Sequence, residues 1–312
     1  MTIKTLRLLA AATMLLSLAS CDNDENYDPF ANGPVQMSFT ADINGVATRA
    51  TATGFETGDA VGIIPVKGGN VETAQANIAY TRGSTGFSAT TPYYFQERGN
   101  VTFNAYYPYA ANLAGNYGIT IDTRSVNQSI ETVNGHDWRK NDYLFASAET
   151  NVKAPTISFT GAKAFNHVMS SIAFKFKAGT ANGVASVKGL SGYFIGDFVM
   201  DGTFNCSTGA VTLKKGAAAE PIAFSEYCPV EATEYTTNPL ILLPQVVDGG
   251  QISLVVYFNK EEYTAKLKLA ELVAGTRYEF PVTIKNTGLE IGNAEIIDWS
   301  TGSSSEGDAI LQ

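Results

Sequence analysis

Apolar and polar side chains alternate with a period of two along much of this chain. Between residues 35 and 43 the odd positions carry mostly apolar side chains and the even positions carry Gln, Ser, Thr and Asp. The same alternation recurs at residues 172–177, 263–269 and 278–284. Successive side chains of a β-strand point to opposite faces, so each run predicts a strand with one buried face.

Turn-forming sequences separate these runs. Examples lie at residues 67–70, 201–202, 248–250 and 259–262, and they are rich in Gly, Asn and Asp. Many short strands joined by frequent turns predict an all-β protein made of β-sandwiches, with helix limited to a few turns around residues 71–79. Pro281 lies in the run 278–284. Since proline cannot donate a backbone hydrogen bond, it predicts that this strand lies at a sheet edge.

The length of 312 residues leaves room for about two domains. The first half is rich in aromatic residues, at 93–95 and 106–109, and a fresh strand pattern begins at Phe165. We therefore place a boundary near Gly161, with domains at residues 35–161 and 162–300 and a flexible tail at 301–312. The aromatic clusters could form a ligand platform, but packing within the core is the favoured interpretation.

The first residues are typical of a secretory signal. Lys4 and Arg7 precede an apolar run at residues 8–19, which is too short to span a bilayer. Small residues then lead directly to Cys21. This arrangement predicts a lipoprotein signal peptide over residues 1–20, with Cys21 as the lipidated first residue of the mature chain; an ordinary signal peptide is the alternative. The acidic, polar residues 21–34 predict a tether for surface export, or a plain spacer.

Composition narrows the function classes further. A net charge of −9 argues against nucleic acid as a partner, because phosphate binding needs a clustered basic surface. Hydrophobic residues make up 45% of the chain, which is enough for packed cores. No later segment is long and apolar enough to cross a membrane, so the lipid is the only anchor that the sequence predicts.

Catalytic and metal-binding patterns are missing from the sequence. His136 and His167 lie in no metal-binding motif, and no nucleophile elbow, P-loop or dinucleotide fingerprint is present. Cys206 and Cys228 could form a disulfide or could be separate buried apolar side chains. We therefore expect no enzyme, no cofactor and no metal.

Several short sequences, in their order and spacing, resemble the fimbrillin-like lipoproteins, the type V pilins of Gram-negative gut and oral anaerobes. The matching pieces lie at residues 18–21, 37–41, 47–50, 55–62, 103–109, 142–146, 165–172, 202–205, 242–245, 272–278 and 296–299. The resemblance implies two transthyretin-like antiparallel β-sandwich domains in an outer-membrane lipoprotein. It also implies a subunit of surface fimbriae that adheres to host or bacterial ligands and assembles with other fimbrial subunits.

The resemblance further implies assembly by donor-strand exchange. A protease would cut between Arg49 and Ala50, and the first strand would then leave its groove for a strand of another subunit. The apolar side chains of that first strand are Val35, Met37, Phe39 and Ile43.

The C-terminal end departs from the pattern of shaft subunits, in which this end acts as the donor. The polar tail ends in a short apolar stretch at residues 309–311, which cannot replace residues 35–43. Either the region around Ile291, Ile296, Ile297 and Trp299 is the donor, or the chain is an anchor, a tip or an unpolymerised relative. The alternative function is a surface lipoprotein that binds a glycan or host ligand without polymerising.

Overall fold

The computed structural model describes residues 28–44, 54–113, 115–124, 141–225, 228 and 230–298. These residues form β-strands, turns and short 3-10 segments, which confirms the all-β expectation. The helix expected near residues 71–79 is a single 3-10 turn, Thr73–Gln75. Within the described ranges, no helix has both the length and the apolar character needed to span a membrane. The predicted signal peptide, most of the tether and the tail lie outside the described residues.

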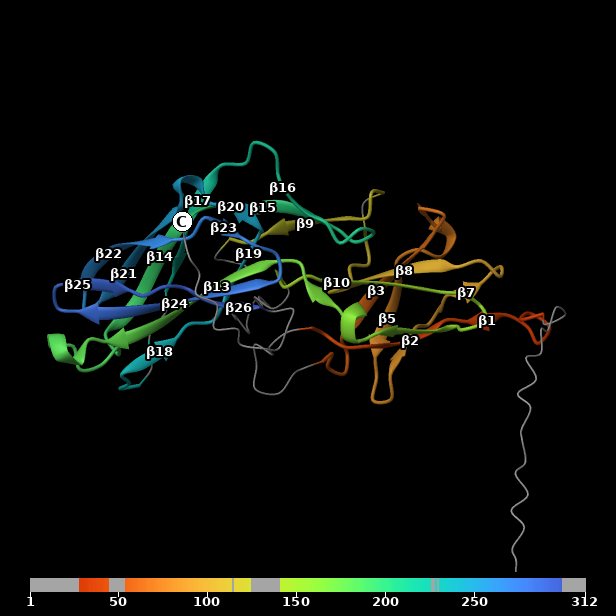
Figure 1. Cartoon of the computed structure of the whole chain (residues 1–312), viewed down its shortest axis with the longest axis horizontal. Coiled ribbons are helices and arrows are strands. Elements are labelled where there is room, and N and C mark those ends of the chain that lie inside the picture. Colours follow the sequence, from red (N-terminus) through yellow and green to blue (C-terminus); the bar gives the residue numbers. More distant parts are fainter. Residues whose placement is uncertain are drawn as a thin grey trace, which may run out of the picture.

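The first sandwich packs a large twisted sheet against short strands that include the N-terminal one (Figure 1). The large sheet has the order β12-β10-β8-β3-β5-β6, with β4 paired to β3. Its strands are β3 (Ala60–Lys67), β4 (Asn70–Val71), β5 (Ile78–Arg82), β6 (Phe87–Ser88), β8 (Val101–Tyr107), β10 (Leu144–Thr150) and β12 (Asn166–His167). The short strands pair as β1 (Val35–Gln36) with β7 (Tyr94–Phe95) and β2 (Ser38–Ala41) with β11 (Thr156–Phe159).

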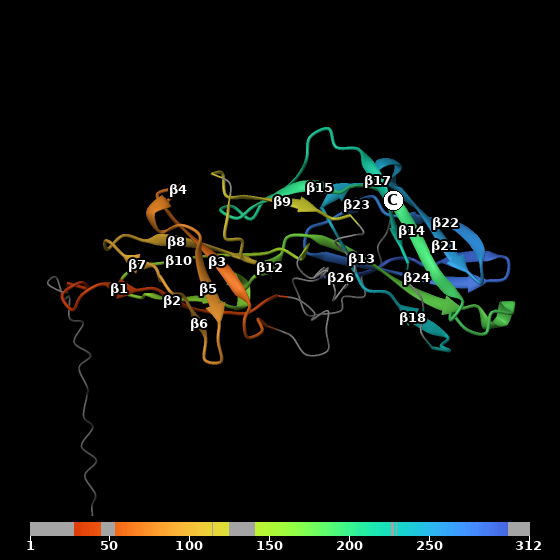
Figure 2. The ribbon, with the colours of Figure 1, turned by 180° about the vertical axis from the view of Figure 1, so that it is seen from behind.

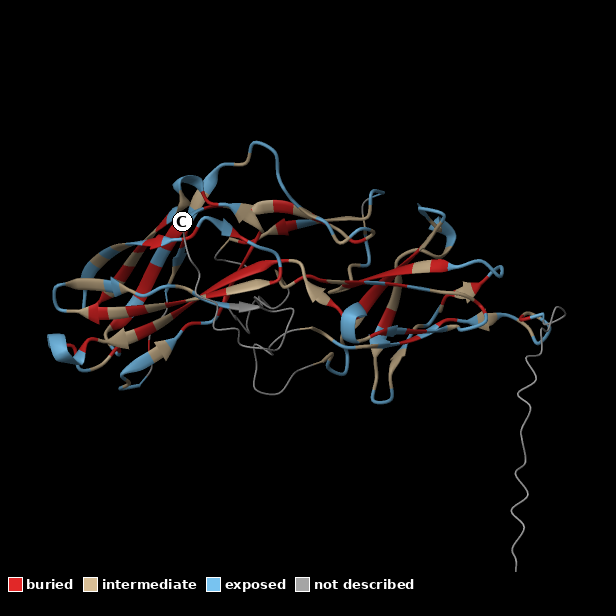
Figure 3. Ribbon diagram, in the orientation of Figure 1, coloured by how far each residue is buried: buried red, intermediate tan, exposed pale blue. Residues whose placement is uncertain are grey.

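The second sandwich has two larger layers. One sheet has the order β18-β13-β24-β25, with β19 also paired to β13 and β26 also paired to β24; the other has the order β17-β14-β21-β22. The first layer consists of β13 (Ser170–Ala178), β18 (Glu234–Thr236), β19 (Leu240–Leu242), β24 (Thr276–Lys285), β25 (Gly288–Ile291) and β26 (Glu295–Asp298). The second consists of β14 (Leu190–Val199), β17 (Ala219–Phe224), β21 (Gln251–Phe258) and β22 (Glu261–Lys268). Figure 3 shows buried residues along the strands of both sandwiches.

A third set of contacts joins the two sandwiches. Strand β9 (Gly118–Asp122) pairs with β15 (Asp201–Asn205) (Figure 2), and β15 also pairs with β16 (Val211–Leu213). A hydrophobic cluster beside them combines Ile64 and Tyr106 with Phe204 and Leu243. The short pair β20 (Gln245–Val246) and β23 (Glu271–Leu272) adds a further small sheet. The two sandwiches therefore meet through the sheet of β9, β15 and β16 and through the hydrophobic cluster beside it. The domain boundary near residue 161 stays a proposal.

Two sequence-based expectations need correction. Asp201 and Gly202, expected in a turn, begin strand β15 instead. Pro281 does not lie on an edge strand, because β24 pairs with β13 on one side and with β25 and β26 on the other. The proline falls where the partner changes from β25 to β26, and its carbonyl accepts a hydrogen bond from the Gly292 N–H at 2.9 Å. Because the ladder is interrupted at this position, the N–H that proline lacks leaves no carbonyl of a neighbouring strand without its donor.

The Cys206–Cys228 disulfide does not form in this structure. Both are free, buried thiols. Cys206 lies in the cluster between the sandwiches, whereas Cys228 lies in the core of the second sandwich. The cysteines are therefore separate apolar core residues, and burial raises the pKa of the Cys206 thiol to about 12.

Candidate functional site

The N-terminal strand covers one side of the first sandwich core. Met37 and Phe39 point inward and are 0% and 6% exposed. Val35 and Ile43 are half-buried and pack against the same cluster. The period-two pattern thus identified the buried face correctly, and two of its four apolar side chains carry most of the burial.

The backbone of this strand is held at three places. Strand β1 pairs antiparallel with β7, and the Met37 N–H donates to the Tyr93 carbonyl at 2.9 Å. Strand β2 runs parallel to β11, with Phe39 opposite Ile157. Beyond them, Ile43 forms a parallel bridge to Phe165. Among the described strands, β2 has no sheet partner other than β11, so its second edge is unpaired.

An aromatic pocket receives Phe39. Its ring centroid lies 4.7 Å from Phe87, 5.2 Å from Tyr80 and 5.5 Å from Phe159. Aromatic pairs at these separations contribute about 0.5–1.5 kcal/mol each beyond the burial of area. Sequence analysis missed the three pocket residues, because they come from strands that are adjacent only in the fold. Phe39 is the main anchor of the strand.

Asn44 and Phe55, which flank the predicted cleavage site in the sequence, both contact Phe165. The Asn44 N–H donates to the Phe165 carbonyl at 2.8 Å, and the Phe55 ring lies 5.0 Å from the Phe165 ring. The Asn44 amide also donates to the Asn166 side chain at 3.0 Å. The predicted cleavage site, Arg49 and Ala50, lies between these anchors in residues 45–53, outside the described residues. Both flanks of that segment are therefore fixed at Phe165.

The predicted donor region forms part of its own sheet. Strand β26 pairs with Thr276–Glu279 of β24, and Ile291 at the end of β25 pairs with Val282. Ile296 is 40% exposed, and Ile291 is half-buried. Ile297 occupies a position in β26 opposite Arg277, whereas Trp299 lies outside the described residues. If this region is the donor, it must first leave β24.

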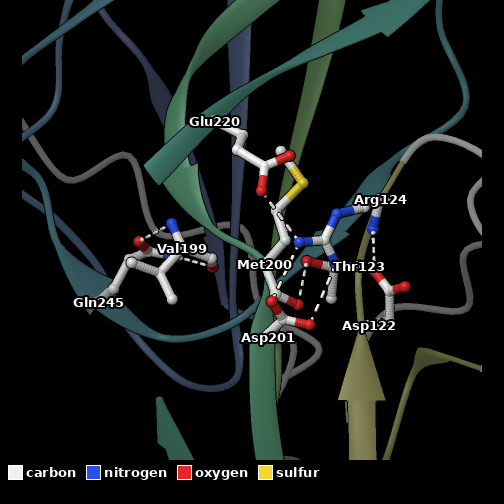
Figure 4. Close-up of polar contacts among 8 residues, drawn as sticks. All are labelled: Asp122, Thr123, Arg124, Val199, Met200, Asp201, Glu220 and Gln245. Atoms are coloured by element: carbon white, nitrogen blue, oxygen red, sulfur yellow. Dashed lines mark hydrogen bonds and ion pairs between the residues drawn. The ribbon is translucent and has the colours of Figure 1, made fainter. Parts of the chain in front are cut away.

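Arg124 connects the junction strand β9 to the second sandwich (Figure 4). Its guanidinium donates to both carboxylate oxygens of Asp201 and to Glu220 and Asp122, each at 3.0 Å. Beside it, the Thr123 N–H donates to the Met200 carbonyl at 3.0 Å. The guanidinium lowers the pKa of Asp201 below its usual 3.8. Sequence analysis missed this cluster because Asp201 and Glu220 are far from Arg124 along the chain.

A lowered carboxyl pKa makes the Asp201 contribution to stability pH-dependent. The contribution is fully present above the usual pKa near 3.8 and is lost as the pH falls through the lower folded value. We therefore expect the difference in melting temperature between wild type and Arg124→Gln to be largest at neutral pH and to shrink below about pH 4. Thermal melts followed by circular dichroism from pH 7 to pH 2.5 measure it.

Arg98→Gln is the matched control. Arg98 pairs with Asp28 at 3.4 Å, and both side chains are more than half exposed. Exposed pairs contribute little to stability, so this variant should melt like wild type at every pH. A constant difference for Arg124→Gln across the range would show that the ion pair to Asp201 does not support the junction.

Within the described part of the chain, no group of three or more His, Cys, Asp or Glu side chains is placed to hold a metal ion. His167, the described one of the two histidines, lies on β12 in the large sheet of the first sandwich. Its Nδ1 is 2.7 Å from Asp142, and its side chain is 10% exposed. The contact between His167 and Asp142 connects β12 to the segment before β10, which is the role of a structural histidine.

Comparison with known proteins identifies the family. The model of the family described as fimbrillin-like matches residues 48–299. This chain belongs to the fimbrillin-like family. The match covers most of the chain and includes the strands of both sandwiches from β3 onward. The resemblance inferred from the sequence is confirmed, and the family is one of fimbrial structural proteins rather than enzymes.

Individual relatives agree with this assignment. The "Putative fimbrium subunit Fim1C" of Bacteroides uniformis is 26% identical in an alignment of 308 positions that covers 93% of each chain. The crystal structure of a "putative cell adhesion protein" from Bacteroides ovatus matches with a TM-score of 0.71 and 25% identity, over 87% of this chain and all of that one. A structure of the same description from Bacteroides uniformis gives a TM-score of 0.67 at 22% identity, over 86% of this chain and 99% of the other, which shows a shared fold.

Proposed function

We propose that this fimbrillin-like chain is a structural and adhesive subunit of a cell-surface fimbrium, assembled by strand exchange after cleavage between Arg49 and Ala50. The observation that carries the proposal is the attachment of residues 35–43. This strand covers a core and inserts Phe39 into an aromatic pocket, and along its β2 segment one backbone edge is paired, to β11. A strand held in this way can be replaced by another extended segment with the same alternation.

Cleavage would break the covalent connection between the N-terminal strand and the rest of the first sandwich, in whose groove the strand lies. While the chain is intact, residues 45–53 connect the strand to Gly54 and keep its local concentration high. After the cut, the segment that holds Phe39 is retained by non-covalent contacts alone. The groove would then pair with the incoming strand of another subunit.

The test of polymerisation uses the cells that make the protein. Material sheared from the surface and run on unboiled gels should give a ladder of multimers that collapses to the single subunit on boiling. Sheared material that migrates as the single subunit without boiling would favour the alternative, a surface lipoprotein that binds a glycan or host ligand and never polymerises. That alternative is supported by β26, which already occupies its own sheet.

Lipidation of Cys21 gives a direct prediction. Cys21 follows the small residues at the end of the signal sequence and would carry the acyl chains that hold the protein in the outer membrane. A Cys21→Ser variant should therefore shift from the membrane fraction to the soluble fraction and lose incorporation of labelled palmitate. Membrane association equal to that of wild type would contradict this anchor, and Cys228→Ser is the control that leaves lipidation unchanged.

Surface exposure gives a second prediction. The acidic residues after Cys21 are proposed as an export tether that places both sandwiches outside the cell. Protease added to intact cells should digest the protein while a periplasmic marker stays whole. If the protein is digested only after the cells are lysed, the two sandwiches face the periplasmic side of the outer membrane instead.

A further inference from the structure

The outer face of the sheet β17-β14-β21-β22 carries a pair of aromatic side chains. Phe194 on β14 is 38% exposed, although it is a large apolar residue in the middle of a sheet. Its ring lies 5.7 Å from the ring of Tyr257 on β21 at an interplanar angle of 68°. Val255 lies directly opposite Phe194 in the ladder. The four strands lie side by side at the end of the molecule away from the N-terminal strand (Figure 1).

These side chains line a hollow of about 300 Å³. Phe194, Val255 and Tyr257 supply its apolar surface, and Asp197, Ser253 and Glu262 supply polar groups. The volume is at the small end of the range for ligand sites, which suits one compact ring and not a large cofactor. An apolar surface with a few polar groups is the usual composition of a small-molecule site.

An irregularity in β14 shapes this hollow. The register between β14 and β17 shifts between Ile195 and Phe198, so Gly196 and Asp197 form a bulge. Gly196 has a φ of +122°, and a Cβ there would lie 3.2 Å from the Cα of Pro221. Only glycine fits this conformation and this close approach without strain. Bulges often redirect a side chain beside a functional site, and here the exposed Asp197 lies at the hollow.

The polar groups favour a ligand rich in hydroxyls. The Tyr257 hydroxyl donates to Glu262 at 3.1 Å. Asp197 and Glu262 are acceptors, and none of the described residues that line the hollow is basic. Lys266 reaches the edge, where it bonds the Ser253 hydroxyl. Two carboxylates disfavour an anionic ligand by repulsion and accept hydrogen bonds well from hydroxyl groups.

We propose that this hollow binds one pyranose ring of a neutral glycan. The C–H face of the sugar packs on the face of one of the two rings, Phe194 or Tyr257, which carries partial negative charge, since the rings lie at 68° to each other. Its hydroxyls donate to Asp197 and Glu262 and accept from the Ser253 hydroxyl. Such a site works in the single uncleaved chain, so it is independent of cleavage and polymerisation and supplies a chemical class for the adhesive ligand.

The test uses the uncleaved full chain and defined sugars. The probes are the methyl glycosides of glucose, galactose and mannose, with N-acetylneuraminic acid as the anionic comparison, each studied by saturation-transfer NMR and titration. We expect saturation of the ring C–H protons of at least one neutral glycoside and none of the anionic sugar. Phe194→Ala should weaken binding at least about tenfold, whereas Phe194→Tyr should retain it within about threefold.

Two further variants distinguish a specific sugar site from non-specific binding to exposed apolar side chains. Asp197→Asn keeps the shape but removes the charged acceptor, so binding should weaken about three- to tenfold. Val246→Ala changes an apolar side chain that is 80% exposed on the separate strand β20 and should leave binding unchanged. The proposal is overturned if no neutral glycoside shows saturation or if the anionic sugar binds equally well. It is also overturned if Val246→Ala weakens sugar binding as much as Phe194→Ala does, or if Phe194→Ala instead abolishes a dimer seen by ultracentrifugation. Because none of these readouts involves cleavage at Arg49, failure here leaves the strand-exchange proposal standing.

Discussion

Replacing Phe39 by alanine is expected to lower the free energy of unfolding of the first sandwich by about 3–5 kcal/mol. The ring is 6% exposed and lies within 5.5 Å of three other aromatic rings, so truncation leaves a cavity in addition to the loss of buried area. Two walls of that cavity belong to β5 and β6, which are paired in the large sheet and cannot easily collapse into it, and the third belongs to β11, the partner of β2. Urea denaturation of the uncleaved protein, followed by circular dichroism, measures the change.

Phe194→Ala is the matched control for that measurement. It makes the same substitution on a strand, but the Phe194 side chain is 38% exposed. Its effect should stay below about 1 kcal/mol, because exposed positions lose little packing. Equal effects of the two variants would mean that the N-terminal strand is not an integral part of the core, and the strand-exchange proposal would lose its physical basis.

The inward face of the N-terminal strand could be predicted because it depends on local sequence alone. A period of two fixes which side chains share a face, and Met37 and Phe39 are buried as that rule requires. The partner strand and its direction could not be predicted in the same way. Strand β2 runs parallel to β11, whose residues lie more than a hundred positions later, and periodicity carries no information on such pairing.

The same limit explains the error at Pro281 and the missed cluster at Arg124. A proline lacks the N–H that would donate to a neighbouring strand, so it is disfavoured where a strand pairs continuously on both sides. It is tolerated inside a sheet where one neighbour ends and the next begins, and Pro281 lies at such a place, between β25 and β26. Arg124 meets Asp201 and Glu220 across 77 and 96 residues. Only the pairing of β9 with β15 brings these charges together.

Cleavage after Arg49 is expected to convert a monomer into a protein that forms SDS-resistant multimers. In the intact chain, residues 45–53 tie the strand to a point beside Phe165, so any competing strand must displace a tethered one. After cleavage, the fully buried side chains of Met37 and Phe39 still contribute about 3–6 kcal/mol, as an upper bound. The cut strand should therefore leave slowly by itself and rapidly when a better-fitting strand is present.

The experiment compares three purified precursors. The wild-type precursor should stay monomeric, and trypsin-like nicking should yield a new N-terminus at Ala50 and multimers on unboiled gels. Arg49→Ala should give neither product. Arg98→Ala, which removes an exposed arginine elsewhere in the first sandwich, should behave like wild type.

Phe39→Ala connects the two predictions. If the retained strand limits exchange, the nicked Phe39→Ala protein should form multimers faster than nicked wild type, because the anchor in the aromatic pocket is gone. Faster exchange with unchanged cleavage would identify strand release as the slow step. If nicked wild type stays strictly monomeric even with its partner subunits added, the groove does not exchange strands in this chain, and the surface lipoprotein that binds its ligand as a single subunit becomes the better account.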